Sequence, residues 1–185
     1  HLAAKIYAHT SYYDGMITKW LSAQKDETGH AAPTASLEVH AQFNSELRYG
    51  ENPQQKAAWY QSEQTGLHEA EILQGKALSF NNLLDLTAAA QTLREFGNEP
   101  TCVAVKHNNP CGVASRKTLE AAAKASVEAD PVSVFGGILA LNGTVDAATA
   151  EFLSGIFLEC IVAPKFSEEA KAVFAKKKNL RLLEW

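Results

Sequence analysis

The chain has little cysteine, no long apolar run and no excess of positive charge, and each shortage excludes a class of protein. Its 3 cysteines are odd in number and lack C-x-x-C spacing, so neither a disulfide framework nor a zinc site is expected, and a reducing cytoplasm is favoured. No apolar run approaches the roughly 18 residues of a membrane-spanning helix. With 17 basic against 21 acidic residues, nucleic-acid binding is not expected either.

The composition that remains is ordinary for a soluble globular protein, 46% hydrophobic and 21% charged over 185 residues. Apolar residues recur at helical spacing over residues 1–22, which predicts one amphipathic helix. Residues 23–39 are polar and small and read as a linker, and a new unit covers residues 40–185. The helix begins at His1 without a capping residue, and the chain stops on an apolar strand at Trp185. We therefore expect a chain cut from a longer one.

Strand and helix patterns alternate in the second part of the chain, which predicts an α/β fold. Such alternation implies crossover connections and a mostly parallel sheet between layers of helices. The expected helices cover residues 82–96, 117–129, 146–155 and 168–178, with Asn81 or Asn82, Asp146 and Ser167 as N-caps of the first, third and fourth. The expected strands cover residues 56–61, 70–73, 101–106, 133–141, 158–163 and 180–183.

The segment 101–114 is the most informative part of the sequence. A buried, β-branched strand ends abruptly in Lys106 and His107, and ligands of open α/β sheets bind beyond such strand ends. Consecutive strand residues point to opposite faces, so the two side chains share a cavity only if the strand unwinds there. Asn109 before Pro110 is a turn signal that supplies the reason. Lys106 and His107 are thus candidate catalytic residues, the alternative being a solvated lysine beside a hydrogen-bonded histidine.

Three further segments offer ligand-binding groups, each with a structural alternative. Arg48 and Tyr49 lie in a polar, turn-rich stretch, where a guanidinium suits a phosphate and a phenol can pack on a ring; the alternative is a loop that caps a sheet edge. Gly136 and Gly137 interrupt an apolar run, which marks a bulge or a close backbone approach to a ligand. Glu159 starts an apolar strand and must find a partner or face a cavity.

The remaining polar residues are read more simply. Ser79, Asn81 and Asn82 are expected to cap a helix, and Lys76 is expected to be solvated. Lys165 and the lysines at 176–178 are expected to form a solvated surface, the latter in the last turn of a helix.

Four of these segments together resemble one family. They are RYGENP at 48–53, LQGKALSFNN at 73–82, VKHNNPCG at 105–112 and DPVSVFGG at 130–137. In order and spacing they resemble the bifunctional purine-biosynthesis enzymes AICAR transformylase / IMP cyclohydrolase, in the bacterial form. Residues 1–22 look like the closing helix of the cyclohydrolase domain, and residues 40–185 look like the first half of the transformylase domain.

The resemblance implies a fold, a reaction and a set of site residues. The fold would be a three-layer α/β/α, cytidine-deaminase-like unit without zinc. The reaction would transfer a formyl group from formyl-tetrahydrofolate, the cosubstrate, to the amine of aminoimidazole carboxamide ribonucleotide (AICAR), with no metal required. His107 would accept the proton and Lys106 would stabilise the transition state. The expected ribonucleotide contacts are Arg48, Tyr49, Gly136 and Glu159, with Asn108, Asn109 and Gly137 as weaker candidates.

The resemblance also sets expectations for the parent protein. It would be a cytoplasmic homodimer that binds AICAR and folate, and this piece alone would be inactive or nearly so. A zinc-type nucleoside deaminase is a competing reading, but Pro110-Cys111 is not followed by a second cysteine at position 114, which is Ala114. A second alternative is a non-catalytic nucleotide-binding or assembly module.

Overall fold

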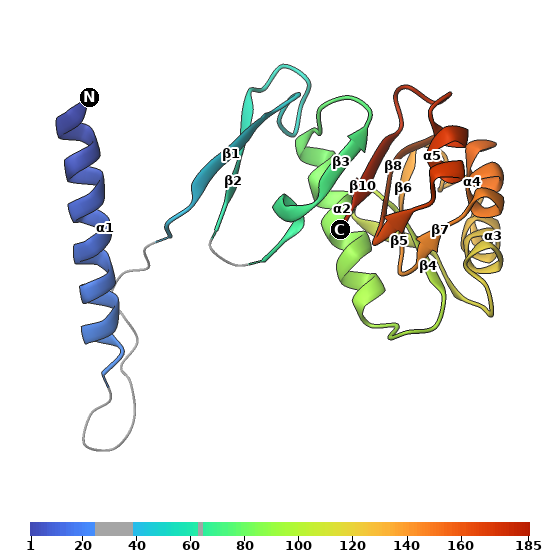
Figure 1. Cartoon of the computed structure of the whole chain (residues 1–185), viewed down its shortest axis with the longest axis horizontal. Coiled ribbons are helices and arrows are strands. Elements are labelled where there is room, and N and C mark those ends of the chain that lie inside the picture. Colours follow the sequence, from blue (N-terminus) through green and yellow to red (C-terminus); the bar gives the residue numbers. More distant parts are fainter. Residues whose placement is uncertain (25–38, 63–64) are drawn as a thin grey trace. The chain divides into compact units, whose positions relative to one another are not determined.

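The structure, a computed structural model, describes residues 1–24, 39–62 and 65–185 (Figure 1). The chain divides into two compact units, His1–Ala41 and Gln42–Trp185. Most of the predicted linker falls at 25–38, outside the described residues. None of the helices described is long and apolar enough to cross a membrane.

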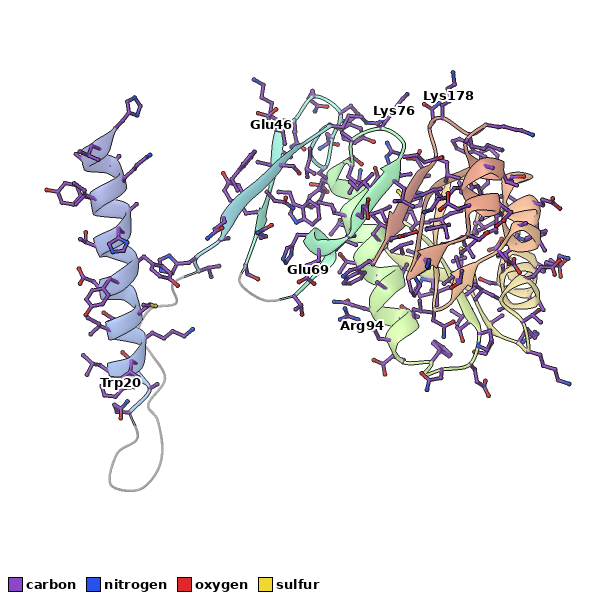
Figure 2. All side chains as sticks on the ribbon, viewed as in Figure 1. Trp20, Glu46, Glu69, Lys76, Arg94 and Lys178 are labelled. Atoms are coloured by element: carbon purple, nitrogen blue, oxygen red, sulfur yellow. The ribbon has the colours of Figure 1, made fainter. Side chains whose placement is uncertain are left out.

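The described residues of the first unit form the helix α1 (Leu2–Ser22), which matches the helix predicted from the apolar spacing. None of its residues is buried, and its large apolar side chains are exposed, Trp20 among them (Figure 2). The assignment of this helix to a cyclohydrolase domain stays a prediction.

The second unit holds a six-stranded sheet and a separate hairpin. The hairpin pairs β1 (Gln42–Leu47) with β2 (Ala57–Gln61) in antiparallel fashion. The sheet has the order β3-β10-β8-β6-β4-β5. Its strands are β3 (Glu71–Gln74), β4 (Thr101–Lys106), β5 (Asn109–Ser115), β6 (Gly137–Leu141), β8 (Leu158–Ala163) and β10 (Arg181–Glu184). A short parallel pair, β7 (Thr144–Val145) and β9 (Lys165–Phe166), and the 3-10 turn η1 (Leu67–Glu69) complete the strands and connections.

The prediction of a mostly parallel sheet is wrong, because the sheet is mixed. Only β10–β8 and β8–β6 pair in parallel; β3–β10, β6–β4 and β4–β5 are antiparallel. The sequence did not predict β5, because Pro110 and Gly112 are typical of a loop. Proline is tolerated at a sheet edge, where β5 lies, and the register shift opposite Ala104 and Val105 leaves Cys111 as a bulge residue. A strand that follows its neighbour through a two-residue turn must run antiparallel to it.

Helices cover both faces of the sheet, so the unit has the three layers that were expected (Figure 1). On one face α2 (Phe80–Arg94) packs against Val103, Val105 and Ile138. On the other face lie α3 (Leu119–Ala129), α4 (Ala147–Ser154) and α5 (Glu168–Phe174). Alternate residues of β4 enter opposite clusters, as the period-two geometry of a strand requires.

Polar side chains cap the N-termini of α2, α4 and α5. Asp146 and Ser167 are N-caps, as predicted. The N-cap of α2 is Ser79, not Asn81 or Asn82. Asn82 is instead the third helical residue of a capping box, in which its side chain and that of Ser79 each bond the other's backbone N–H.

Two predicted elements are shorter than the sequence suggested. Residues 131–136 form turns, so β6 begins only at Gly137. Helix α5 ends at Phe174, and the lysines at 176–178 therefore lie in the loop that leads to β10 rather than in a helical turn. This places them at the same end of the sheet as Lys76 (Figure 2).

Candidate functional site

A cavity of about 560 Å³ lies at this end of the second unit, and its lining is strongly cationic. Six basic side chains and a single carboxylate line it, together with apolar residues that include Phe157. The charged lining residues are Arg48, Lys76, Glu159, Lys176, Lys177, Lys178 and Arg181. Such a concentration of positive charge in a concave site suits an anionic ligand, in a chain whose net charge is −4.

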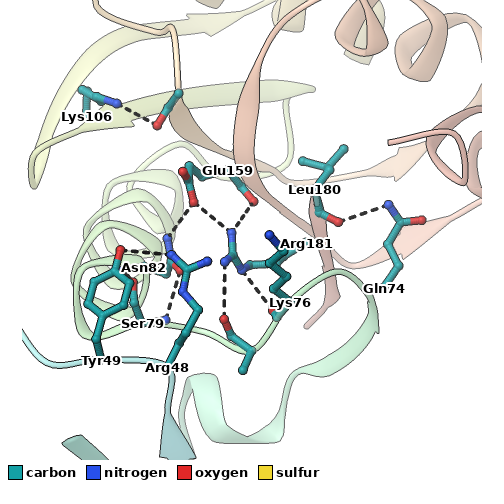
Figure 3. A network of polar contacts seen from close by, with 12 residues as sticks. Arg48, Tyr49, Gln74, Lys76, Ser79, Asn82, Lys106, Glu159, Leu180 and Arg181 are labelled. Atoms are coloured by element: carbon teal, nitrogen blue, oxygen red, sulfur yellow. Dashed lines mark hydrogen bonds and ion pairs between the residues drawn. The ribbon is translucent and has the colours of Figure 1, made fainter. Parts of the chain in front are cut away.

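The single carboxylate of the cavity is held by a buried arginine (Figure 3). Arg181, only 2% exposed, donates from Nη1 to Oε2 of Glu159 at 2.8 Å. Its other donors bond the backbone carbonyl oxygens of Lys76 at 3.0 Å and Ala77 at 3.4 Å. Arg181 is therefore committed to the protein, and Glu159, whose side chain stays 36% exposed, is the group that faces the cavity. The expectation that Glu159 finds a partner or faces a cavity is confirmed on both counts.

The N-terminus of α2 adjoins this ion pair. Asn82 Nδ2 lies 3.5 Å from Oε2 of Glu159, so the capping box and the carboxylate belong to one polar network. Asn82 is buried, and its Oδ1 is already used by the backbone N–H of Ser79. The helix thereby fixes one side of Glu159 while Arg181 fixes the other.

Arg48 and Tyr49 complete the network. The chain that follows β1 docks on the segment before α2, because Arg48 N–H donates to Leu78 O at 2.8 Å and Phe80 N–H donates to Tyr49 O at 3.1 Å. The Arg48 guanidinium donates to Tyr49 Oη at 3.2 Å and lies 4.8 Å from the ring centroid. Hydrogen bonding from Arg48, and then from Ser79, holds the pKa of Tyr49 below its ordinary value.

Lys106 ends β4 and reaches the main chain of Gly136. Its Nζ donates to Gly136 O at 2.8 Å (Figure 3). Gly136 has φ +67°, and a Cβ there would lie 3.0 Å from Lys106 Nζ and 3.3 Å from the Phe157 ring. Gly136 N–H in turn donates to Phe157 O at 2.7 Å, and Phe157 lines the cavity. The glycine is thus required for a close backbone approach, here to a lysine.

His107 and Asn108 form the two-residue turn between β4 and β5. Both have positive φ, 51° and 63°, and Lys106 pairs with Asn109 across the hairpin, which is the pattern of a type I′ turn. The strand does end at Lys106, as expected, but the turn lies at His107 and Asn108 rather than at Asn109 and Pro110, which belong to β5. His107, Asn108 and Asn109 are exposed at its tip and do not line the cavity.

The sequence-predicted residues therefore fall into two groups. Arg48, Tyr49 and Glu159 share the polar network at the cavity, whereas the hairpin residues stand apart from it, linked through the Gly136 and Phe157 backbone. Gly137 is required by packing, because the Cβ of any other residue there would lie 2.8 Å from Val105 O.

The sequence does not show that several polar residues line or adjoin the cavity. Lys76, Lys176 and Lys178 are exposed, as expected, but they also line the cavity, and Asn82 contacts Glu159 in addition to its part in the capping box. Arg181 lies in an apolar strand, where a charged residue, like Glu159, must find a partner.

The cysteines show no nucleophilic environment. Burial raises the pKa of Cys102 and of Cys160 to about 12. Partial burial, and then Asp130, also raise the pKa of Cys111, whose thiol lies 3.6 Å from Ala104 O. Within the part of the chain that the structure describes, no group of three or more His, Cys, Asp or Glu side chains is placed to hold a metal ion.

Comparison with known proteins decides the family. The model of the AICARFT/IMPCHase bienzyme family matches residues 1–185. This chain belongs to that family. It is 52% identical over 186 residues to the bifunctional purine biosynthesis protein PurH of Shouchella clausii and 51% identical over 185 residues to that of Halalkalibacterium halodurans, with 99% and 98% of this chain covered. A PurH protein of Synechococcus sp. is 47% identical over 196 residues.

The chain spans about a third of the length of these relatives, 35% of each of the first two. Among solved structures it is similar to RibD of Acinetobacter baumannii, with a TM-score of 0.41 and 11% identity, over 54% of this chain and 35% of that one.

Proposed function

We propose that this chain carries part of the site at which a formyl group passes from formyl-tetrahydrofolate to the amine of AICAR in purine biosynthesis. The observation that carries the proposal is the cation-lined cavity with one oriented carboxylate, linked through Phe157 and Gly136 to Lys106. Family membership supplies the reaction. The bifunctional activity and the homodimer belong to the proposal for the whole protein, of which this chain would be an inactive part by itself.

The cavity would bind the ribonucleotide. A phosphate has a choice of cations, with Arg48 able to bind it bidentately and the lysines at 176–178 acting as point charges. Hydrogen bonds to charged groups contribute about 1.5–3 kcal/mol each. Glu159 uses Oε2 for Arg181 and Asn82, which leaves Oε1 to accept from the ribose hydroxyls. A cation-rich cavity with one acceptor of this kind fits a phosphorylated sugar.

His107 would act as the base. The amine of AICAR is a poor nucleophile because its lone pair is drawn into the carboxamide-bearing ring. An imidazole, whose ordinary pKa is near 6.5, can accept the amine proton as the bond to the formyl carbon forms. The exposed position of His107 at the hairpin tip leaves its ring free to approach a ligand.

Lys106 would stabilise the oxyanion that develops on the formyl oxygen. Its bond to Gly136 O fixes the ammonium, which keeps two further N–H donors. A fixed donor of this kind contributes about 3–4 kcal/mol to the transition state. The departing folate nitrogen must gain a proton as its bond to carbon breaks, and the Lys106 ammonium is the candidate donor.

An aromatic pair next to Gly136 offers a place for the folate. The rings of Phe135 and Phe157 lie 5.1 Å apart and are 62% and 51% exposed. Exposed aromatic side chains beside a reactive lysine suit a flat, conjugated ligand, and the pterin and benzoyl rings of folate are of this kind. The cosubstrate would then approach Lys106 from the side of residues 135–136.

The test needs a complete enzyme, because the chain spans a third of its relatives. We define the grafted enzyme as the Shouchella clausii relative with residues 1–185 of this chain in place of its matching segment. Lys106→Ala and His107→Ala should each lower kcat for formyl transfer by about 100-fold, with a smaller change in KM. Lys117→Ala and His68→Ala are matched controls and should leave kcat within about twofold.

The competing reading, a non-catalytic nucleotide-binding or assembly module, predicts a different result. In that case the grafted enzyme would retain full formyl transfer in both Lys106→Ala and His107→Ala. Such a result would overturn the roles proposed for these two residues.

A further inference from the structure

The turn that presents His107 is strained. Among the described residues, His107 and Asn108 are the only non-glycine residues with positive φ. Left-handed conformations cost an L-residue about 1–2 kcal/mol, and the usual two-residue turn of this kind uses Asn-Gly to avoid that cost. Here neither position is glycine. A contact from outside the turn must therefore stabilise the left-handed conformation of His107 and Asn108.

A single side chain from α2 supplies that contact. Asp85 Oδ1 accepts a hydrogen bond from the backbone N–H of Asn108 at 2.7 Å, a length typical of bonds to a charged acceptor. Asn109 Nδ2 donates to His107 O at 2.9 Å, but that bond lies within the hairpin. The bond from Asp85 ties the hairpin tip to a different element.

The helix that carries Asp85 is well anchored. Leu86 and Ala89 are fully buried in the cluster beneath it. Asn82, three residues before Asp85, belongs to the capping box and lies 3.5 Å from Glu159 Oε2. One rigid helix therefore holds both the carboxylate of the cavity and the backbone of the turn.

We propose that Asp85 is a positioning residue for His107. It holds the turn in its left-handed conformation through the Asn108 N–H and so sets the place of the imidazole relative to the nucleotide held at Glu159. The inference rests on the proposed function, in which His107 is the base. Asp85 itself acts on the backbone of the turn and needs no contact with substrate.

The first test measures turnover in the grafted enzyme. Asp85→Ala should lower kcat about tenfold with little change in KM for AICAR, because the loss of one bond to a charged acceptor frees the turn. Asp85→Asn keeps an oxygen acceptor and should lose only about threefold. Glu95→Ala, which removes an exposed carboxylate at the end of the same helix, is the matched control and should leave kcat unchanged.

The second test asks whether the loss acts through the turn. Asn108→Gly, added to Asp85→Ala, should restore kcat to the value of Asn108→Gly alone, because glycine adopts positive φ without the cost that an L-residue meets. A structural defect elsewhere in α2 would not be repaired by glycine at the hairpin. Full activity in Asp85→Ala, or a loss that Asn108→Gly leaves in place, would overturn the proposal.

A third measurement separates this inference from the proposed function. Amide hydrogen exchange at Asn108 in the chain of residues 1–185 should be slow in the unmodified protein and much faster in Asp85→Ala. If His107→Ala left turnover intact, the proposed base would be wrong, and the exchange rate would still report on the Asp85 contact. If exchange at Asn108 were equally fast in both chains, the Asp85 contact itself would be refuted.

Discussion

The cavity and the hairpin tip are built in opposite ways. The cavity gathers charge from four separate segments and is fixed by a buried arginine with bonds on several sides. The tip is one short exposed segment in a strained conformation, tied to the rest of the fold by the contact of Asp85. In the proposed function, the rigid cavity binds the nucleotide and the strained tip carries the base, His107, so mutations in the two regions should have different effects.

Arg181→Met should give the largest loss of stability. It leaves the Glu159 carboxylate without its cationic partner and frees three backbone carbonyl oxygens, at a cost of about 3 kcal/mol in the free energy of unfolding. Urea unfolding of the chain measures the change. Lys171→Met, which breaks partly exposed ion pairs with Glu168 and Glu184, is the control and should cost only about 1 kcal/mol. Equal losses would contradict the rigid cavity.

Gly136→Ala should lower both the stability of the chain and the turnover of the grafted enzyme. A left-handed alanine costs about 1–2 kcal/mol, and its Cβ would press on Lys106 Nζ and the Phe157 ring. Gly97→Ala is the matched control, because Gly97 also has positive φ, 57°, but a Cβ there would meet nothing within 4 Å. Both variants should lose similar stability, whereas only Gly136→Ala should lower kcat of the grafted enzyme. An unchanged kcat in Gly136→Ala would show that the position of Lys106 does not matter for the reaction.

Asp146→Ala gives the reference for an ordinary helix cap outside both regions. The loss of the bond to Thr149 N–H should cost about 1 kcal/mol at pH 7. Hydrogen bonding from Thr149 holds the pKa of Asp146 below its ordinary value, so its stabilisation is present above that ordinary value and fades as pH falls through the lowered one. The difference between variant and parent should therefore shrink in acid. A constant difference would show that the carboxylate charge is not involved.

The lysines of the cavity should show the smallest individual effects. Lys176→Gln, Lys177→Gln and Lys178→Gln should each raise KM for AICAR about threefold in the grafted enzyme, and less so at high salt, because exposed charges are screened. Lys165→Gln removes an exposed lysine outside the cavity and should leave KM unchanged. An equal effect of all four would mean that net charge, not the cavity, governs binding.

The sequence predicted best what lies within one segment. The strand that ends in Lys106 is confirmed, as are the caps at Asp146 and Ser167, because capping and strand patterns depend on a few neighbouring residues. It also singled out Glu159 as a carboxylate that needs a partner. These are local signals of propensity and burial.

What the sequence could not show depends on tertiary contacts. The sheet is mixed rather than mostly parallel because β5 is an additional edge strand. It carries a proline, and a proline-containing segment is equally typical of a loop. The partner of Glu159, Arg181, lies 22 positions away along the chain and meets it only because β8 and β10 are neighbours. The role proposed for Asp85 could not be predicted from the sequence, because it depends on the contact between α2 and the turn of the β4–β5 hairpin.

An amide NMR titration of the chain with AICAR asks whether the cavity and the hairpin tip form one nucleotide site, as proposed. The aminoimidazole carboxamide nucleoside, which lacks the phosphate, is the matched ligand. We expect AICAR to shift the amides of Arg48, Glu159 and the lysines at 176–178 together with those of residues 106–109, and the nucleoside to bind far more weakly. Shifts at the cavity alone under saturating AICAR, or no shifts in either region at millimolar AICAR, would contradict it.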